Sequence, residues 1–153
     1  GNLVNVYSDN AGKDGWEKIT LASTIGGMVI NTAGVTLAHG MEHPASGLRD
    51  IVHGKGLAAL TPAIIEASYT GNESKFADIA KLFGGKEAKD LALKIRELLK
   101  SINLNCTLSD LGIEEKDIPW MAENCMKVSA ASVANNPVVF TQEQIADIYK
   151  KAL

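Results

Sequence analysis

The segment from Ala38 to Gly56, AHGMEHPASGLRDIVHGKG, holds all three histidines of the 153-residue sequence: His39, His43 and His53. His39 and His43 are four residues apart. On a helix this spacing places both rings on one face, about 6 Å apart along the axis. The segment therefore predicts a concentration of imidazoles at one place in the fold.

Two helix breakers follow the first histidine pair. Pro44 cannot continue a helix interior and Gly47 favours a turn, so we expect the helix to end here and a loop to follow. His53 comes after that loop and opens the next apolar run, Gly56 to Ile65. The chain can then fold back so that a helix end, a loop and a helix start aim three imidazoles at one point.

The residues alone leave two interpretations of these histidines open. A single helical histidine is usually a core or surface residue with a hydrogen bond. Three within fifteen residues, with none elsewhere, also fit a metal or catalytic site, because imidazole is the commonest metal ligand and i,i+4 histidines recur in such sites. Since two or three nitrogens do not fill a coordination shell, a zinc or iron site would need a carboxylate or a further histidine.

Composition restricts the class of protein. Hydrophobic residues make up 46% of the chain and aromatic residues 5%, so small and aliphatic side chains form the core, as suits closely packed helices. The net charge of −3 gives no basic surface for nucleic acid. No apolar run approaches a membrane span, and no signal-peptide pattern is present. Two cysteines, Cys106 and Cys125, are too few for a disulfide framework, which predicts a reduced, cytoplasmic setting.

Apolar periodicity predicts one long helix ahead of the histidines, from Trp16 to about Ala38, after an irregular lead-in over residues 1–15. Gly26, Gly27 and Gly34 fall inside this helix, where each costs roughly 1 kcal/mol relative to alanine. We interpret them as positions of close helix packing rather than of ligand approach, because other small residues surround them.

The rest of the chain has the same helical period, and nothing alternates like a strand. Asn72 and the Thr141/Gln144 capping box mark two helix starts, and Gly84 marks a helix end. The fold class predicted is all-α, a multi-helix bundle of some six helices. The further helices expected are Gly54 to Tyr69, Glu73 to Phe83, Lys86 to Ile102, Glu114 to Val128, and the C-terminal helix ending at Leu153.

Several segments resemble one protein family, the iron-containing alcohol dehydrogenases, in their C-terminal helical domain. ASTIGGMVINTAGVTLAHGMEHPASG (residues 22–47) and HGKGLAALTPAIIE (residues 53–66) fit the family pattern of a small-residue helix, H-x-x-x-H-P, a loop and H-G. FADIAKLFGG, LSDLGIEEKDI and NPVVFTQEQIADIYKKAL are similar to the family's closing segments, in the same order. The resemblance covers nearly the whole chain.

The resemblance implies a role for each histidine. His39 and His53 fall where the family places two metal ligands, and His43 falls on a histidine that lines the cleft near the nicotinamide. The implied metal is Fe²⁺, with Zn²⁺ as the rival, because imidazole suits both. The implied reaction interconverts small alcohols with aldehydes or ketones by hydride transfer to or from NAD or NADP, in a parent protein that forms homo-oligomers.

The resemblance also implies that this chain is a part of its parent. The family takes two more ligands from an Asp-x-x-x-His pair, but the residues four before the histidines here are Val35, His39 and Arg49. A Gly-rich nucleotide-binding domain is absent as well. We therefore expect residues 1–153 to be a single, partial helical domain that lacks the N-terminal nucleotide-binding domain and the first helices, and that is inactive alone.

Two alternatives remain beside this hypothesis. One is a sister enzyme of the same superfamily, of the glycerol dehydrogenase or dehydroquinate synthase type, which also has an H-x-x-x-H…H-G arrangement. The closing segments LGIEEKDI and NPVVFTQEQI favour the alcohol dehydrogenase over the synthase. The other alternative is a noncatalytic helical module whose histidines are structural.

Overall fold

A computed structural model describes residues 1–153, and it contains nine α-helices, three short 3₁₀ helices and no strand. The predicted all-α class is confirmed. The α-helices are α1 (Leu3–Tyr7), α2 (Gly12–Ala33), α3 (Leu37–Arg49), α4 (His53–Ser68), α5 (Glu73–Leu82), α6 (Asp90–Ser101), α7 (Ile118–Val128), α8 (Ala130–Ala134) and α9 (Gln142–Ala152). The 3₁₀ helices are η1 (Tyr69–Asn72), η2 (Ser109–Leu111) and η3 (Glu115–Asp117).

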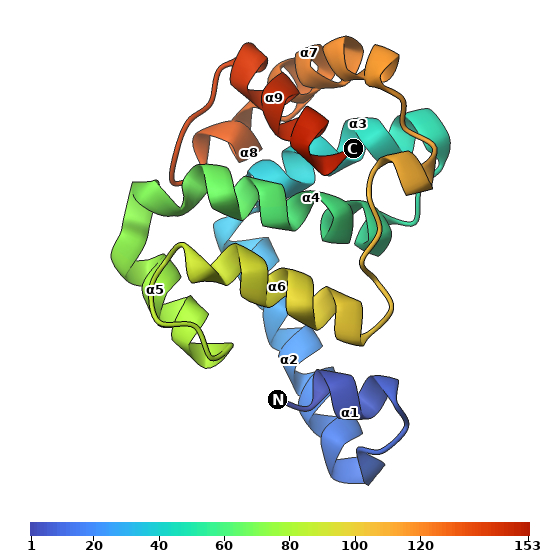
Figure 1. The fold of residues 1–153 in the computed structure, drawn as a ribbon, viewed down its shortest axis with the longest axis vertical. Coiled ribbons are helices and arrows are strands. Elements are labelled where there is room, and N and C mark those ends of the chain that lie inside the picture. The colour runs from blue at the N-terminus through green and yellow to red at the C-terminus, as the bar shows by residue number, and fades with distance from the viewer.

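The hydrophobic core lies between α3, α4, α7 and α9 (Figure 1). Helix α4 packs against α3, α6 and α9, and α7 packs against both α3 and α9. The buried phenol Tyr149 of α9 donates a hydrogen bond of 2.5 Å to the carbonyl oxygen of Met41 in α3. This bond fixes α9 directly behind the segment that carries the histidines.

The predicted caps form as their sequence signals indicate. The Asn72 side chain accepts a hydrogen bond from the backbone N–H of Lys75, so α5 begins at Glu73. Thr141 and Gln144 form the reciprocal capping box at the start of α9. The chain leaves α5 through Gly84, whose φ of 80° lies in the left-handed region that glycine adopts without strain.

The N-terminal predictions need correction. Residues 1–15 are not an irregular lead-in, because Leu3–Tyr7 forms α1 and α2 already begins at Gly12. The long helix predicted up to Ala38 stops at Ala33, where Gly34 takes a φ of 73°. Gly34 is thus a helix-ending glycine rather than an interior one, and a new helix starts at Leu37.

The predicted helix end at Pro44 is also wrong. Pro44 lies inside α3, which continues to Arg49 and ends where Asp50 takes a φ of 50°. A proline in a helix interior costs about 3 kcal/mol or more. The packing of α3 offsets this cost, since Leu37, Met41 and Ala45 are all fully buried in the core. The loop between the histidine helices therefore spans only residues 50–52.

Two further helices are shorter than predicted. Helix α6 begins at Asp90 and not at Lys86, and the Asp90 carboxylate accepts hydrogen bonds from the backbone N–H groups of Lys86 and Glu87 in the turn that precedes the helix. Helix α7 begins at Ile118, after the 3₁₀ helix η3. No single helix is long and apolar enough to cross a membrane; only α2 and α3 taken together reach that length and composition, and they are bent by 99° at their junction.

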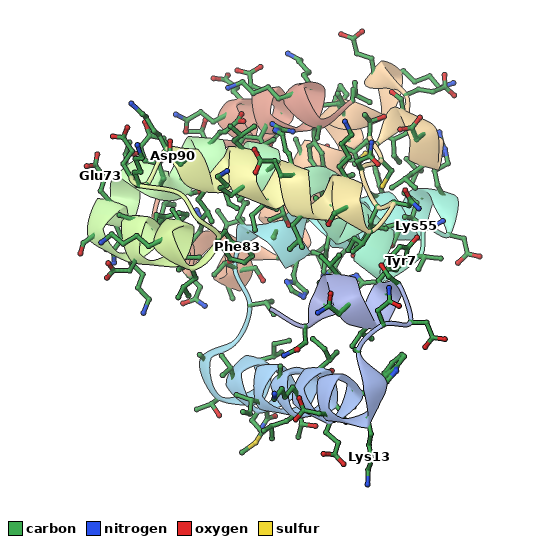
Figure 2. The ribbon with its side chains drawn as sticks, turned by 60° about the horizontal axis from the view of Figure 1, so that its bottom comes forward. Tyr7, Lys13, Lys55, Glu73, Phe83 and Asp90 are labelled. Carbon is green, nitrogen blue, oxygen red and sulfur yellow. The ribbon has the colours of Figure 1, made fainter.

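Helix α2 extends away from the bundle, and α1 packs against it (Figures 1 and 2). A Cβ atom built on Gly26 or Gly27 would meet nothing within 4 Å, so these glycines make no close helix contact within this chain. Close packing occurs instead at Gly40, where a Cβ would lie 3.2 Å from the Cβ of Ser129. Large apolar side chains are exposed along α2: Trp16, Leu21, Ile25, Met28, Val29 and Ile30.

Candidate metal centre

The three histidines lie together where α3 passes the start of α4. Ring centroids are 5.2 Å apart for His39 and His53, 5.8 Å for His43 and His53, and 6.2 Å for His39 and His43. His39 and His43 share one face of α3 because α3 is continuous between them, and His53 is the first residue of α4. The predicted convergence of the three imidazoles is present, although an unbroken helix rather than a helix end produces it.

The spacing of one histidine pair suits a shared metal ion. Two imidazoles bound at about 2.0–2.1 Å to one tetrahedral ion have ring centroids about 5 Å apart. The 5.2 Å between His39 and His53 matches this value, and both separations from His43 are longer. The geometry of the donor set therefore fits a metal held by His39 and His53, with His43 beside it.

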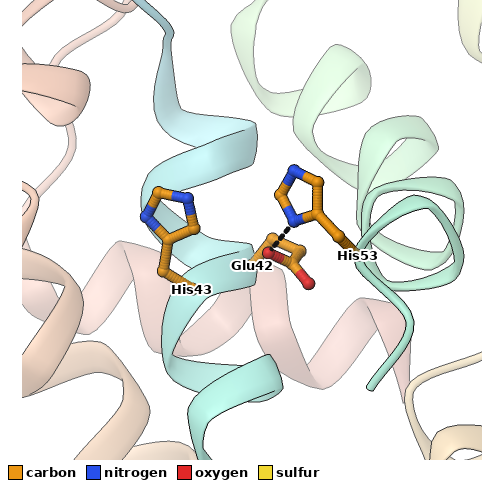
Figure 3. Close-up of side chains that lie close together, drawn as sticks. All are labelled: Glu42, His43 and His53. Atoms are coloured by element: carbon orange, nitrogen blue, oxygen red, sulfur yellow. Dashed lines mark hydrogen bonds and ion pairs between the residues drawn. The ribbon is translucent and has the colours of Figure 1, made fainter. Parts of the chain in front are cut away.

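A buried carboxylate that the sequence pattern does not predict, Glu42, contacts one histidine of this cluster. Glu42 is completely buried, and Figure 3 shows its carboxylate facing His53. The Nδ1–H of His53 donates to Glu42 Oε2, and the Ser46 hydroxyl donates to Glu42 Oε1. Both carboxylate oxygens therefore have protein partners.

Glu42 also allows a second ligand set. One ligand atom each from Glu42, His43 and His53 lie within 4.8 Å of one another, whereas His39 falls outside this group. The two sets share His53 and differ in their other members. We favour the pair His39/His53 because its ring spacing of 5.2 Å is shorter than the 5.8 Å between His43 and His53, and because the contact of His53 Nδ1 with Glu42 leaves His53 Nε2 for a metal.

The surroundings of His39 shift its pKa toward the neutral form of the ring. Partial burial lowers the pKa of His39, and the neighbouring His53 and His43 lower it further, against an opposing effect of Glu42. A metal ligand must be the neutral imidazole, so these surroundings favour the form that binds a cation.

A sequence signal for Glu42 exists. Glu42 lies three residues after His39 and four before Ser46, so all three share a helix face if α3 continues. This shared face is not predicted if Pro44 is expected to end the helix. The position of Glu42 relative to His53 depends on the turn at residues 50–52, which the sequence pattern does not specify.

Comparison with known sequences now identifies the family. Residues 1–153 match the description "Fe-containing alcohol dehydrogenase family, C-terminal" along their whole length. This chain belongs to that family. The expected resemblance and the predicted fold are both confirmed, and the three histidines lie inside the family's C-terminal region.

Individual relatives agree with the assignment. The chain is 35% identical to 1,3-propanediol dehydrogenase of Citrobacter freundii over 144 residues, which covers 89% of this chain and 37% of that protein. It is 30% identical to lactaldehyde reductase of Escherichia coli K12, which covers 92% of this chain and 38% of that protein. The chain thus spans well under half the length of these two relatives.

A solved structure shows the same fold. The chain superimposes on a halo-thermophilic archaeal alcohol dehydrogenase from a Red Sea brine pool with a TM-score of 0.90 and 30% identity, covering 99% of this chain and 41% of that one. Full-length relatives of this chain are therefore alcohol dehydrogenases and related oxidoreductases.

Proposed function

We propose that this chain is the C-terminal part of a metal-dependent alcohol dehydrogenase that interconverts small alcohols with aldehydes or ketones, using NAD or NADP. The observation that carries the proposal is the pairing of His39 and His53 at 5.2 Å, within a chain that matches the alcohol dehydrogenase family throughout. The nucleotide-binding domain and the remaining metal ligands would come from other parts of a longer, homo-oligomeric protein.

Each histidine has a separate role in this proposal. His39 and His53 bind a divalent cation, Fe²⁺ or Zn²⁺, through neutral nitrogens. A bound cation supplies the positive charge that polarises the alcohol oxygen and lowers the pKa of the hydroxyl. His43 lies on the same helix face one turn further on, with an exposed side chain. It contacts substrate or nicotinamide and orients the reacting groups.

The proposed setting is the cytoplasm. Cys106 and Cys125 are both free thiols, and Cys125 is completely buried. Free thiols are ordinary in reducing compartments.

Metal analysis of the full-length protein tests the proposal. His39→Ala and His53→Ala should each lower metal content and cofactor-dependent alcohol oxidation together, because a lost ligand removes a large part of the metal's binding free energy. His43→Ala should lower activity by about 10²-fold, the usual cost of misplaced reacting groups, while leaving most of the metal bound. Metal content is measured by mass spectrometry and turnover by nicotinamide absorbance.

Three outcomes would contradict the proposal. Full metal retention in the His53→Ala protein would exclude the ligand assignment. If His43→Ala lost its metal while His39→Ala kept it, the ligand set would be Glu42, His43 and His53 instead. Turnover that persists unchanged after removal of metal by a chelator would overturn metal-dependent catalysis itself.

A further inference from the structure

We propose that Glu42 is the positioning residue of this metal centre, whose buried carboxylate holds the His53 ring with Nδ1 turned inward and Nε2 presented to the metal. The inference rests on the proposed function and extends it by one residue. It assigns to Glu42 the orientation of a ligand and not a place among the ligands.

The hydrogen-bonding pattern of Glu42 carries the first step. An ionised carboxylate only accepts hydrogen bonds, so the contact with Glu42 Oε2 places the His53 proton on Nδ1. The other ring nitrogen then has a free lone pair, which is the form that a metal requires. The His53 side chain is 50% exposed while Glu42 is 0% exposed, so one edge of the ring is anchored inside and the other edge is open.

The surroundings of Glu42 fix its own position. The Ser46 hydroxyl contacts Glu42 Oε1 and also lies 3.0 Å from the carbonyl oxygen of Ile51, in the turn before His53. Gly56 provides the space, because a Cβ there would lie 2.7 Å from Glu42 Oε1 and 2.8 Å from Glu42 Cγ. The carboxylate is thus enclosed between α3, the turn and α4, and it has little freedom to swing outward to a metal.

With this arrangement, holding the His53 ring costs Glu42 less free energy than coordinating the metal directly. If the Glu42 carboxylate swung outward to a metal, it would leave His53, and the Nδ1–H of that ring would be left unpaired, at about 1–3 kcal/mol if it stayed buried, whereas the Ser46 hydroxyl could still donate to the Ile51 carbonyl. Ligating histidines in proteins usually donate their second N–H to a carboxylate or a carbonyl. The contact between Glu42 and His53 is of this kind.

The affinity of the full-length protein for Zn²⁺ tests the inference, measured by competition with a chromogenic chelator and repeated with Fe²⁺ without oxygen. Glu42→Ala should weaken the affinity by about 10–100-fold, the usual effect of losing such a partner. Glu66→Ala is the matched control. Glu66 is an exposed glutamate on α4 that pairs with Arg96 at 2.8 Å, and its loss should leave the affinity unchanged.

Glu42→Gln separates orientation from coordination. The Gln side-chain oxygen can accept from His53 Nδ1–H while its NH₂ donates to the Ser46 oxygen, whose own hydrogen then serves Ile51. A positioning role predicts affinity within a few-fold of the parent protein for this variant. A ligand role predicts that Glu42→Gln loses the metal as severely as Glu42→Ala does. If Glu42→Ala does not fold, the Glu42→Gln affinity alone decides between these roles.

The test distinguishes failure of this inference from failure of the proposed function. If the parent protein binds no metal, or if His39→Ala and His53→Ala leave binding intact, the proposed metal centre is wrong. If both histidine variants lose metal but Glu42→Ala retains it fully, the centre stands and Glu42 has no positioning role. Nitrogen NMR of the His53 ring gives a readout that does not depend on activity: the Nδ1-protonated tautomer should dominate in the parent and in Glu42→Gln, and it should no longer dominate in Glu42→Ala.

Discussion

At the scale of single residues, the candidate metal centre combines three histidines that the sequence predicts with one carboxylate, Glu42, that it does not. His39, His43 and His53 could be named from spacing and family resemblance because all three lie in one short segment. Glu42 could not, since its contact with His53 requires both a helix that continues through Pro44 and a turn of three residues. The helix period predicts which side chains share a face of α3, whereas the contact of Glu42 with His53 depends on the conformation of a turn that the sequence pattern does not specify.

The close approach of Gly56 to Glu42 gives a prediction for stability. Gly56→Ala should lower the free energy of unfolding by about 1–3 kcal/mol, because its methyl group would overlap a fully buried carboxylate. In a Glu42→Ala background the same change should be neutral or stabilising by up to about 1 kcal/mol, since alanine favours a helix and the obstacle is gone. Urea unfolding of the four proteins of this cycle measures the coupling.

Gly47→Ala is the control for this cycle. Gly47 also lies in a helix, but a Cβ there meets nothing within 4 Å, so this substitution should not destabilise the protein in either background. Equal effects of Gly56→Ala with and without Glu42 would show that the two residues do not compete for space.

The two thiols should differ in reactivity. Burial raises the pKa of the Cys125 thiol to about 11. At pH 8 its thiolate fraction is therefore about 100-fold smaller than that of an ordinary thiol, and the thiolate is the nucleophile. Cys106 is only partly buried, and its sulfur lies 3.6 Å from the carbonyl oxygen of Lys55.

Iodoacetamide labelling of the folded protein, followed by peptide mass spectrometry, measures this difference. At pH 8 Cys106 should be modified first, and Cys125 far more slowly while the protein stays folded. Raising the pH from 8 toward 11 should increase the thiolate fraction of Cys125, so any labelling of the folded protein at this residue should accelerate over that range. Equal labelling of both cysteines at pH 8 would contradict the burial of Cys125.

At the scale of helices, chemistry that acts within one or two turns was predictable. The Asn72 cap, the Thr141/Gln144 box and the Gly84 stop all form as their sequence signals indicate. The errors at Gly34 and Pro44 have tertiary causes. The break after Gly34 lets α3 turn into the core, and burial of α3 outweighs the cost of its proline.

One long-range ion pair fastens α3 to the start of α7. Arg49 Nη2 lies 2.6 Å from Asp117 Oδ2, and Arg49 Nε donates to the carbonyl oxygen of Gly112 at 2.9 Å. Asp117 also accepts from the backbone N–H of Glu114 at 3.0 Å, so the arginine holds a capped turn in place. The Asp117 side chain is only 10% exposed, so water screens this pair less than it screens a surface pair.

Arg49→Ala should therefore lower the free energy of unfolding by about 1.5–3 kcal/mol, the range for hydrogen bonds to charged groups. The control is Arg96→Ala, which removes a pair with Glu66 whose side chains are 47% and 44% exposed. This second change should cost at most about 1 kcal/mol. Both values come from urea unfolding, and equal losses would mean that the Arg49 contacts add nothing beyond a surface pair.

At the scale of the whole molecule, the bundle and the extended helix α2 have different packing. The core between α3, α4, α7 and α9 contains 19 buried residues, while α2 has large apolar side chains that are exposed to solvent. Exposed apolar patches of this kind mark interaction surfaces. Sequence periodicity predicted that α2 has an apolar face, but it could not show that this chain leaves the face uncovered, since that depends on which segments lie nearby.

The isolated chain is predicted to lack alcohol dehydrogenase activity. Residues 1–153 contain neither a Gly-rich nucleotide loop nor an Asp-x-x-x-His pair, so we expect no alcohol oxidation with NAD or NADP by this chain alone. Its two proposed ligands, His39 and His53, should hold a divalent cation far more weakly than the full-length protein does, because two nitrogens fill only half of a four-coordinate shell.

Calorimetric titration with Zn²⁺ and a nicotinamide absorbance assay, run on the isolated chain beside the full-length protein, measure both effects. Cofactor-dependent turnover by the isolated chain would show that the reaction needs no nucleotide-binding segment outside these residues. Equal Zn²⁺ affinity of the two proteins, lost on His53→Ala, would show that the metal needs no ligand outside them.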